Sequence, residues 1–343
     1  MKLRDYILRR VLLSIPVFFG ITIIVFTLTR SVGDPASIYI TPDMTHEQVE
    51  WVREYYHFKD PIHVQYFYWL KGILQGDMGH SEVLNLPVSE AIITFLPASM
   101  ELAMYSFVLS LAIGVFLGTL SAVKKDTWVD HLIRFVALSG FSLPLFWFAL
   151  LLLYVFYSVL GVVTPGRLSM DVITTYLPPY GDFKLYTGFL TIDSIINGNL
   201  IVFVDALKHL ALPTVVQTYT RQAVFTRILR SSMLEELGKE YVTLGHAKGL
   251  DQNTVIKKYA RRNALIPLAT VAGMQFVAIF SGVVVTESVF NWPGLGRLAA
   301  SAAMSLDHAT ILGFALFMGI LFIISNLVVD ILYTYLDPRI RFD

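Results

Sequence analysis

The sequence contains no cysteine in its 343 residues, and this absence excludes disulfide bonds, thiolate catalysis and metal sites built on sulfur. Charged residues are also scarce, at 15% of the chain, whereas a typical soluble protein has about a quarter. The 26 basic and 26 acidic side chains balance each other, so the net charge gives no reason to expect binding to nucleic acid. Hydrophobic residues are what the chain has in excess, at 55%.

Sequence motifs of the common enzymes are missing as well. No G-x-x-x-x-G-K-[ST] occurs, so the chain has no phosphate-binding loop of that type, and neither H-E-x-x-H nor G-x-S-x-G is present. The eight histidines are scattered, which favours surface or interface positions over metal ligation. We therefore expect a chain that is not an enzyme and holds no metal or cofactor of its own.

Long uncharged runs indicate the class of protein. Each of five runs reaches the roughly 18–20 residues that an α-helix needs to cross the hydrocarbon of a bilayer. These runs are Val11–Thr29, Leu102–Val123, Phe135–Val163, Asn263–Thr286 and Ala309–Val329. The sequence therefore predicts an all-α polytopic membrane protein that is embedded in the lipid bilayer.

A sixth span is predicted at 209–229, although this segment contains polar residues and an arginine. Four of the first ten residues are basic, which places the N-terminus in the cytoplasm by the positive-inside rule. Residues 30–97 carry nine acids against four basic residues, an extracytoplasmic bias. Without the span at 209–229, the strongly basic segment that follows it would lie outside the cell. The first run is too long for a signal peptide and no cleavage-type residues follow it, so we expect a retained span.

Six spans with both termini inside satisfy these constraints. The predicted segments are a cytoplasmic N-terminus at 1–10, spans at 11–29, 99–123, 135–163, 209–229, 266–286 and 309–335, extracytoplasmic segments at 30–97, 164–208 and 287–308, a cytoplasmic loop at 230–265 and a cytoplasmic tail at 336–343.

The cytoplasmic loop is the most informative segment. Residues 227–262 carry eight Lys/Arg against four acids and are helix-forming apart from Gly238, Gly245 and Gly249. Gly249 indicates a turn with positive φ or a close approach by a partner, and Pro267 is expected in the first turn of the next span. The alternative is an ordinary inner loop whose charges only obey the topology rule.

This loop resembles a known element. The run Glu240-Tyr-Val-Thr-Leu-Gly-His-Ala-Lys-Gly-Leu, followed by Arg262-Asn-Ala-Leu-Ile-Pro, is similar to the cytoplasmic EAA loop of ABC-importer permeases in the dipeptide/oligopeptide (peptide/nickel) binding-protein-dependent family. Other stretches agree in order along the whole chain: Gly33-Asp-Pro, Gly76-Asp-Met-Gly-His-Ser, Leu96-Pro-Ala-Ser-Met-Glu-Leu-Ala, Gly140-Phe-Ser-Leu-Pro, Thr286-Glu-Ser-Val-Phe-Asn-Trp-Pro-Gly-Leu-Gly-Arg-Leu and Asp337-Pro-Arg-Ile-Arg. Gly245, Leu244 and Ser99 depart from the usual family residues, which concerns local packing.

The resemblance implies a role and a set of partners. The loop would be the coupling element toward the ATPases, through Glu240, Tyr241, Ala247, Lys248, Gly249, Leu250, Arg262 and Asn263. The partners implied are a second permease subunit in a heterodimer, two cytoplasmic ABC ATPases that bind ATP and Mg, an extracytoplasmic solute-binding protein and a peptide cargo. The membrane would be a bacterial or archaeal plasma membrane.

Polar residues within spans are candidates for the translocation path, because they are costly in hydrocarbon and usually face a cavity or another helix. On the span at 209–229, Gln217 and Arg221 lie one turn apart, as do Thr218 and Gln222. An equally weighted alternative is that Arg221 reaches the headgroups while the others bond neighbouring helices. The candidate path residues are Ser139, Ser142, Gln217, Arg221, Gln222 and Gln275.

Two further features of the spans carry local expectations. Gly140 and Pro144 predict a kink, with Ser139 and Ser142 satisfying the carbonyls that it frees, although plain helix packing is an alternative reading. Glu101, at the outer edge of its span, is expected at the membrane interface.

Two other functional classes compete with an ATP-driven importer. An ion-coupled secondary transporter would need carboxylates at mid-membrane, and an intramembrane enzyme would need paired catalytic groups at depth; the sequence shows neither pattern. Within the importer reading, the cargo could also be an oligosaccharide, nickel or glutathione.

Overall fold

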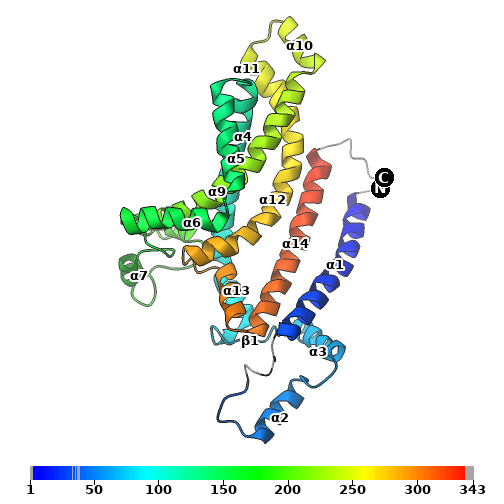
Figure 1. Cartoon of the computed structure of the whole chain (residues 1–343), viewed down its shortest axis with the longest axis vertical. Helices are drawn as coiled ribbons and strands as arrows, with labels where there is room; N and C mark the ends of the chain where they lie inside the picture. Colours follow the sequence, from blue (N-terminus) through cyan, green and yellow to red (C-terminus); the bar gives the residue numbers. More distant parts are fainter. Residues whose placement is uncertain (1–2, 33, 35, 37–38, 337–343) are drawn as a thin grey trace. The chain divides into compact units, whose positions relative to one another are not determined.

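The computed structural model describes residues 3–32, 34, 36 and 39–336 (Figure 1). In this part of the chain the strands form one hairpin, in which β1 (His80–Ser81) pairs antiparallel with β2 (Leu86–Pro87), and the all-α prediction is confirmed. The helices are α1 (Leu3–Val32), α2 (His46–Tyr55), α3 (Ile62–Leu74), α4 (Val88–Val123), α5 (Trp128–Ser142), α6 (Leu145–Leu153), the π-helix η1 (Tyr154–Val159), α7 (Met170–Tyr176), α8 (Leu190–Ile196), α9 (Leu200–Leu237), α10 (Glu240–Ala247), α11 (Gln252–Thr254), the π-helix η2 (Val255–Ala260), α12 (Arg261–Val289), α13 (Leu295–Met304) and α14 (His308–Leu336). The predicted tail lies, apart from Leu336, outside the described residues.

Four helical stretches of the described chain are long and apolar enough to cross a membrane, namely Arg9–Ser31, Val88–Val123, Leu200–Leu237 and His308–Val328. Two bent pairs add up to two more, if each pair is one span: Trp128–Ser142 with Leu145–Val159, and Gln252–Phe276 with Ala278–Val289. The weakly hydrophobic segment at 209–229 lies inside the third of the four unbroken stretches.

The predicted kink in the third span is confirmed, and it is close to a right angle. The chain turns by 101° between α5 and α6. Pro144 cannot donate a helical hydrogen bond, and it holds the preceding Leu143 in an extended conformation (φ −76°, ψ 127°). The expected role of the two serines is wrong. Ser139 Oγ donates to the Val136 carbonyl and Ser142 Oγ to the Leu138 carbonyl, both within the last turns of α5 and upstream of the carbonyls that the break exposes.

The expectation for Pro267 is also wrong. It lies inside α12, six residues after the first residue of that helix, instead of in the first turn. The helix starts earlier because η2 runs into Arg261 without a break in helical backbone. The proline therefore removes one internal backbone hydrogen bond that a first-turn position would not have required.

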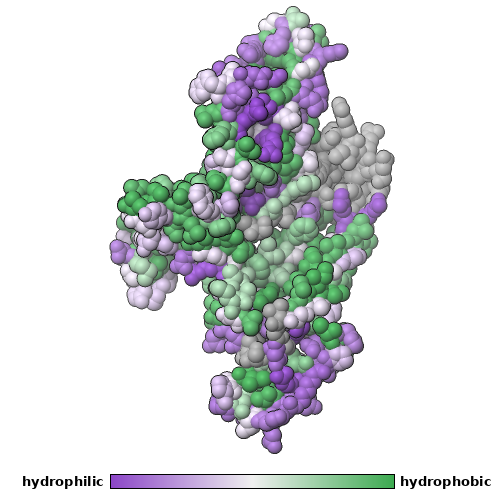
Figure 2. All heavy atoms as spheres, in the orientation of Figure 1, coloured by the Kyte–Doolittle hydropathy of each residue, from purple (hydrophilic) through white to green (hydrophobic). Residues whose placement is uncertain are grey.

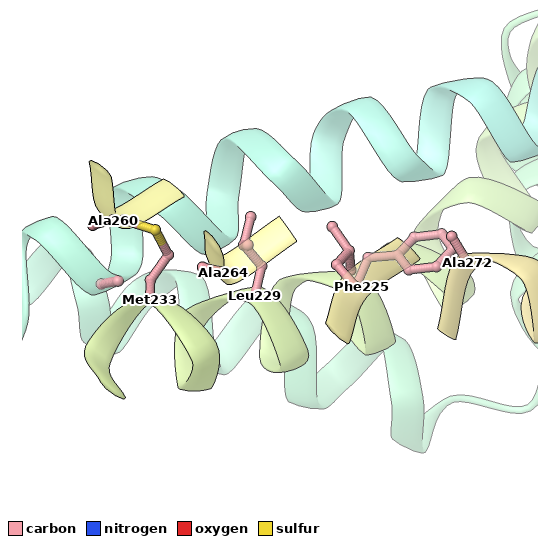
Figure 3. Packing of buried hydrophobic residues seen from close by; sticks show 8 residues of the cluster. Phe225, Leu229, Met233, Ala260, Ala264 and Ala272 are labelled. Carbon is pink, nitrogen blue, oxygen red and sulfur yellow. The ribbon is translucent and has the colours of Figure 1, made fainter. Parts of the chain in front are cut away.

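By its contacts the chain divides into two units, one of Ala98–Pro293 with Ser325–Asp343 and one of Lys2–Pro97 with Gly294–Ile324. In the first unit, α9 packs against α4, α5 and α12 (Figure 1). The aromatic ring of Phe225 and the side chains of Leu229 and Met233 are fully buried on α9 between α4 and the alanines of η2 and α12 (Figure 3). This cluster fixes the base of the segment that carries α10.

Small residues permit the close contact of α4 with α9. A Cβ atom added at Gly114 would lie 2.4 Å from the Cβ of Phe225, and one at Gly118 would lie 2.9 Å from the Cβ of Leu229. Helices in a membrane gain little from the hydrophobic effect between them, so close packing of this kind is a main source of their association.

The second unit contains α1 to α3, the hairpin, the start of α4, α13 and most of α14. Thr45 is the N-cap of α2 and forms a capping box with Gln48. Val88 is fully buried and packs directly on Gly313, where an added Cβ would lie 2.3 Å away. Asp307 caps α14 by accepting from the Thr310 backbone N–H at 3.0 Å, and it also accepts from Ser81 Oγ at 3.1 Å.

Candidate coupling loop and translocation path

The loop between α9 and α12 is folded as a short helix with a glycine-ended C-terminus. The Gly249 N–H donates to the His246 carbonyl at 2.9 Å, and the Leu250 N–H donates to the Gly245 carbonyl at 3.2 Å. These two bonds form a Schellman motif in which the residue after the C-cap takes a left-handed conformation, and Gly249 has φ +75°. Of the two sequence alternatives for Gly249, the positive φ is confirmed. No heavy atom lies within 4 Å of an added Cβ, so close approach within this chain is not the reason for the glycine.

Asp251 then starts the next helical segment. Its Oδ2 accepts from the Thr254 backbone N–H at 3.0 Å, as an N-cap does. These hydrogen bonds from Thr254 hold the pKa of the exposed Asp251 carboxyl below its usual value, so the cap stays ionised at neutral pH. The loop is therefore specified by local hydrogen bonds at both of its turns.

The two ends of the loop are tied to each other. Tyr241 of α10 donates its hydroxyl hydrogen to a carboxylate oxygen of Glu236, at the end of α9. Asn263 of α12 donates to the same Tyr241 hydroxyl at 3.1 Å. Burial, and then the hydrogen bond to Glu236, raise the pKa of Tyr241, and the Glu236 carboxylate raises the pKa of Lys239, whose Nζ lies 2.5 Å away. The predicted residues Tyr241 and Asn263 thus meet, and Glu236, which the sequence analysis had not singled out, joins them.

Most of the predicted coupling residues lie on the surface. Glu240, Ala247, Lys248, Gly249, Arg262 and Asn263 are exposed, while Tyr241 and Leu250 are half-buried. Leu244 adds an apolar side chain that is 54% exposed. Figure 2 shows hydrophilic residues gathered over the end of the first unit that carries α10 and α11, whereas residues of α6 are mostly hydrophobic. The predicted coupling residues therefore lie mainly on the exposed face of the loop.

Gly245, where the family usually has alanine, is a buried residue of α10. A Cβ added there would lie 3.4 Å from Val255 Cγ2, near ordinary van der Waals contact. The departure from the family pattern is therefore compatible with the same packing of α10 on η2. Ser99 behaves similarly, because its hydroxyl donates to Glu287 Oε1 at 2.5 Å, a bond that a threonine hydroxyl also makes.

A buried ion pair below the loop was not expected from the sequence. Asp130 of α5 has no exposed side-chain surface and accepts two hydrogen bonds from Arg230 of α9, at 2.8 and 2.6 Å. It also accepts from Ser121 Oγ at 2.5 Å and from the Asp126 backbone N–H at 3.1 Å. Four hydrogen bonds to one carboxylate connect the end of α4, the turn after it, α5 and α9.

A polar hollow of about 290 Å³ lies where α5 breaks, beside α9 and α12. Three of the six candidate path residues line it, namely Gln217, Arg221 and Gln275. Arg221 donates to the Ala278 carbonyl at 2.8 Å and to Gln217 Oε1 at 3.4 Å. The side chain of Gln217 is fully buried, and its Nε2 finds no acceptor in the described part of the chain. The hollow therefore offers both a cation and an unused donor.

Of the other three candidates, Gln222 and Ser139 lie against neighbouring helices, whereas Ser142 is exposed and donates to the Leu138 carbonyl of its own helix. Gln222 is buried and accepts from Thr226 at 3.0 Å, on the side of α9 where Thr218 donates to the Ser106 carbonyl of α4 at 3.4 Å. Ser139 shares a hydrogen bond of 2.7 Å with the Tyr219 hydroxyl. The polar stripe on α9 thus splits, since residues 217 and 218 point about 100° apart around a helix.

The expectation for Glu101 is wrong. Its side chain is buried instead of interfacial, and it is paired with Arg167. Its Oε1 accepts from the backbone N–H and the hydroxyl of Thr191, at 2.9 and 2.7 Å. The segment between η1 and α9 folds back against α4 and supplies these partners, which no local pattern around residue 101 indicates.

The long apolar helices define a multi-pass helical membrane protein. Residues 114–342 match the model of the binding-protein-dependent transport system inner membrane component, and residues 3–102 match the model of the N-terminal part of such components. The chain belongs to this family of inner-membrane transport components.

Curated relatives match the chain over nearly its whole length. The dipeptide transport system permease protein DppB of Alkalihalophilus pseudofirmus is 36% identical, over 98% of this chain and 99% of that protein. The DppB of Escherichia coli K12 is 37% identical, over 98% of each chain. The oligopeptide transport system permease protein AppB of Bacillus subtilis is 36% identical, over 98% of this chain and 99% of that protein.

Proposed function

We propose that this chain is a permease subunit of an ABC importer and forms half of a translocation pathway for di- or oligopeptides. The observation that carries the coupling part is the exposed α10, which is closed by the Schellman turn at Gly249 and tied at both ends through Glu236, Tyr241 and Asn263. Because α10 is held at both ends, a displacement of this helix by a bound ATPase would be passed on to the membrane-spanning helices. The names of the relatives, which are dipeptide and oligopeptide permeases, support the peptide cargo.

The partners follow from this role. We propose a second, different permease subunit, two cytoplasmic ATPases that bind ATP and Mg and receive the loop, and an extracytoplasmic binding protein that delivers the peptide. The chain itself holds no cofactor. It would lie in a bacterial or archaeal plasma membrane with both termini in the cytoplasm.

The proposal is tested by reconstitution in proteoliposomes. The purified chain alone should show no ATP hydrolysis above that of empty liposomes, because it has no phosphate-binding loop. Together with the second permease, the ATPases and a peptide-loaded binding protein from the same genome, it should support ATP-dependent uptake of a radiolabelled dipeptide. ATP turnover by the isolated chain, or uptake driven by an ion gradient without ATP, would contradict the proposal.

The proposed orientation gives a labelling prediction. Because the chain has no cysteine, single cysteines can be introduced on a clean background. Glu50→Cys and Asp182→Cys should react in intact cells with a thiol reagent that does not cross membranes, whereas Gln252→Cys should react only after the cells are opened. Labelling of Gln252→Cys in sealed cells would exclude the six-span orientation.

We also propose that the hollow at the α5 break belongs to the peptide path. Arg221→Ala should then lower the kcat/KM of uptake about tenfold, because one charge-assisted hydrogen bond is worth about 1.5–3 kcal/mol, while complex assembly stays normal. Gln222→Ala is the matched control on the opposite side of the stripe, and it should alter the yield of folded protein more than cargo preference. If Arg221→Ala only reduces the folded protein, the residue is structural.

A further inference from the structure

The second unit contains a separate hollow of about 260 Å³. It is lined by the end of α1, the segment from Tyr39 to Phe58, α3, residues 77–79 and the start of α14 (Figure 1). Its volume is just below the range of about 300–1,000 Å³ that is usual for small-molecule sites, so it suits a ligand of one or two amino-acid residues in size. The proposed function does not depend on this hollow.

Arg30, in the last turn of α1, supplies the charge of this hollow. Its guanidinium carbon lies 5.1 Å from the ring centre of Phe26 and 4.9 Å from that of Phe58, so aromatic rings hold it in place. Its Nε is buried and has no acceptor, and no ion pair of Arg30 occurs within the described residues. The nearby carboxylate of Asp34 is already engaged by Arg53 at 2.5 Å. The Arg30 guanidinium is therefore held in place without an ion-pair partner, and it can bind an anion.

Two more side chains in the hollow have unused hydrogen-bonding atoms. His308 is only 4% exposed, and neither of its ring nitrogens has a partner among the described residues. Gln65 donates its amide hydrogens to the carbonyls of Phe58 and Asp60, at 3.1 and 2.8 Å, which leaves its buried Oε1 without a donor. Buried polar groups in proteins are nearly always paired. Three side chains with unused hydrogen-bonding atoms in one hollow therefore indicate a binding site for a polar ligand.

Aromatic rings form the remaining wall. Tyr39 stacks on Tyr56 with ring centres 4.4 Å apart, and His57 stacks on Tyr68 at 3.8 Å. Burial raises the pKa of Tyr39 to about 12, so its hydroxyl stays neutral at physiological pH and does not repel an anion. Asp77 is the one carboxylate in the described lining, and its Oδ1 accepts from the Gly79 N–H at 2.8 Å.

We propose that this hollow binds a small carboxylate that carries an N–H group close to it, such as a free amino acid or the C-terminal end of a short peptide. The carboxylate pairs with Arg30 and accepts from the N–H of His308. The ligand N–H donates to Gln65 Oε1, and its apolar part lies against the tyrosine rings. This inference goes beyond the proposed function, because the site would hold its ligand whether or not the system moves peptides.

Calorimetric titration of the full chain in phosphatidylcholine nanodiscs tests the proposal, with L-alanyl-L-alanine as the probe. We expect saturable binding to the wild type, and binding at least tenfold weaker for L-alanyl-L-alaninamide, which lacks the carboxylate. Arg30→Gln should weaken dialanine binding about tenfold or more, since it removes a charge-assisted pair. Gln65→Met should also weaken it, because the substitution removes the oxygen that accepts from the ligand N–H. Lys71→Gln, which removes an exposed cation of α3 outside the lining, should change binding less than twofold.

Other results would overturn the proposal. They are no saturable binding to the wild type, equal binding of the amide, or loss of binding in Arg221→Ala but not in Arg30→Gln, which would place the ligand in the first unit. Binding of glycerophosphoethanolamine in place of dialanine would assign the hollow to a lipid headgroup. A melting curve of each variant separates loss of the site from loss of the fold, and should Arg30→Gln not fold, Gln65→Met decides the outcome.

Discussion

Replacement of Gly249 by aspartate should abolish uptake by the assembled transporter while the protein still inserts at near-normal levels. Gly249 has φ +75° at the end of α10, and a residue with a Cβ in the left-handed region costs about 1–2 kcal/mol. That cost is modest here, because nothing lies within 4 Å of the added Cβ and no apolar helix is touched. The larger effect comes from a new negative charge on the exposed surface proposed to enter an ATPase.

Gly249→Asn is the matched control for this experiment. Asparagine has the size of aspartate and tolerates the left-handed conformation equally well, but it adds no charge. It should retain a substantial part of the uptake, whereas Gly249→Asp should retain almost none. Uptake and membrane level are measured together in cells that express the whole system. Equal, full activity of both variants would show that this turn does not contact an ATPase.

Asp130→Asn should reduce the stability of the first unit by about 3 kcal/mol. The substitution leaves Arg230 without its carboxylate, and breaking a buried ion pair costs about 3–5 kcal/mol. The lower end of this energy range applies because the Arg230 side chain keeps 20% of its surface exposed. Unfolding of the detergent-solubilised protein, followed by tryptophan fluorescence in denaturant, measures the change.

The control for this pair is Asp126→Asn in the preceding turn. The Asp126 side chain is 71% exposed, and its ion pair with Lys125 is long, at 3.8 Å. Exposed pairs of this kind contribute about 0–1 kcal/mol, so the variant should unfold close to the wild type. Equal destabilisation by the two variants would mean that the turn as a whole, and not the pair of Asp130 with Arg230, holds α5 to α9.

Local sequence patterns predicted the features that depend on local chemistry. The positive φ at Gly249 and the break at Pro144 each follow from hydrogen bonds or steric limits within a few residues. The apolar runs indicated the membrane class for the same reason, since crossing hydrocarbon depends on the length and composition of one segment. Even the weakly hydrophobic stretch at 209–229 could be placed, because the charges on both sides of it constrain the topology.

Features that join distant segments were missed. Asp130 and Arg230 are 100 residues apart, and Glu101 meets Arg167 and Thr191 only because the segment between η1 and α9 folds back against α4. The prediction for Pro267 was wrong because the start of α12 depends on the preceding η2. That segment carries no proline or cap signal of its own. The sequence placed Gln217 and Gln222 in one stripe, but only the packing of α4 and α12 on α9 decides which of them faces the hollow.

The length of α9 has a mechanical consequence. Its 38 residues span about 57 Å at 1.5 Å per residue, nearly twice the hydrocarbon thickness of about 30 Å. Gln217, beside the hollow, and Glu236, at the tie to α10, lie about 29 Å apart on this one rod. A tilt of about 5° around the hollow would therefore swing the α10 end through about 2.5 Å over that rise. Conversely, a partner that displaces the α10 end by about 2.5 Å rotates α9 at Arg221 by only about 5°, so a large movement at the loop becomes a small rotation beside the hollow.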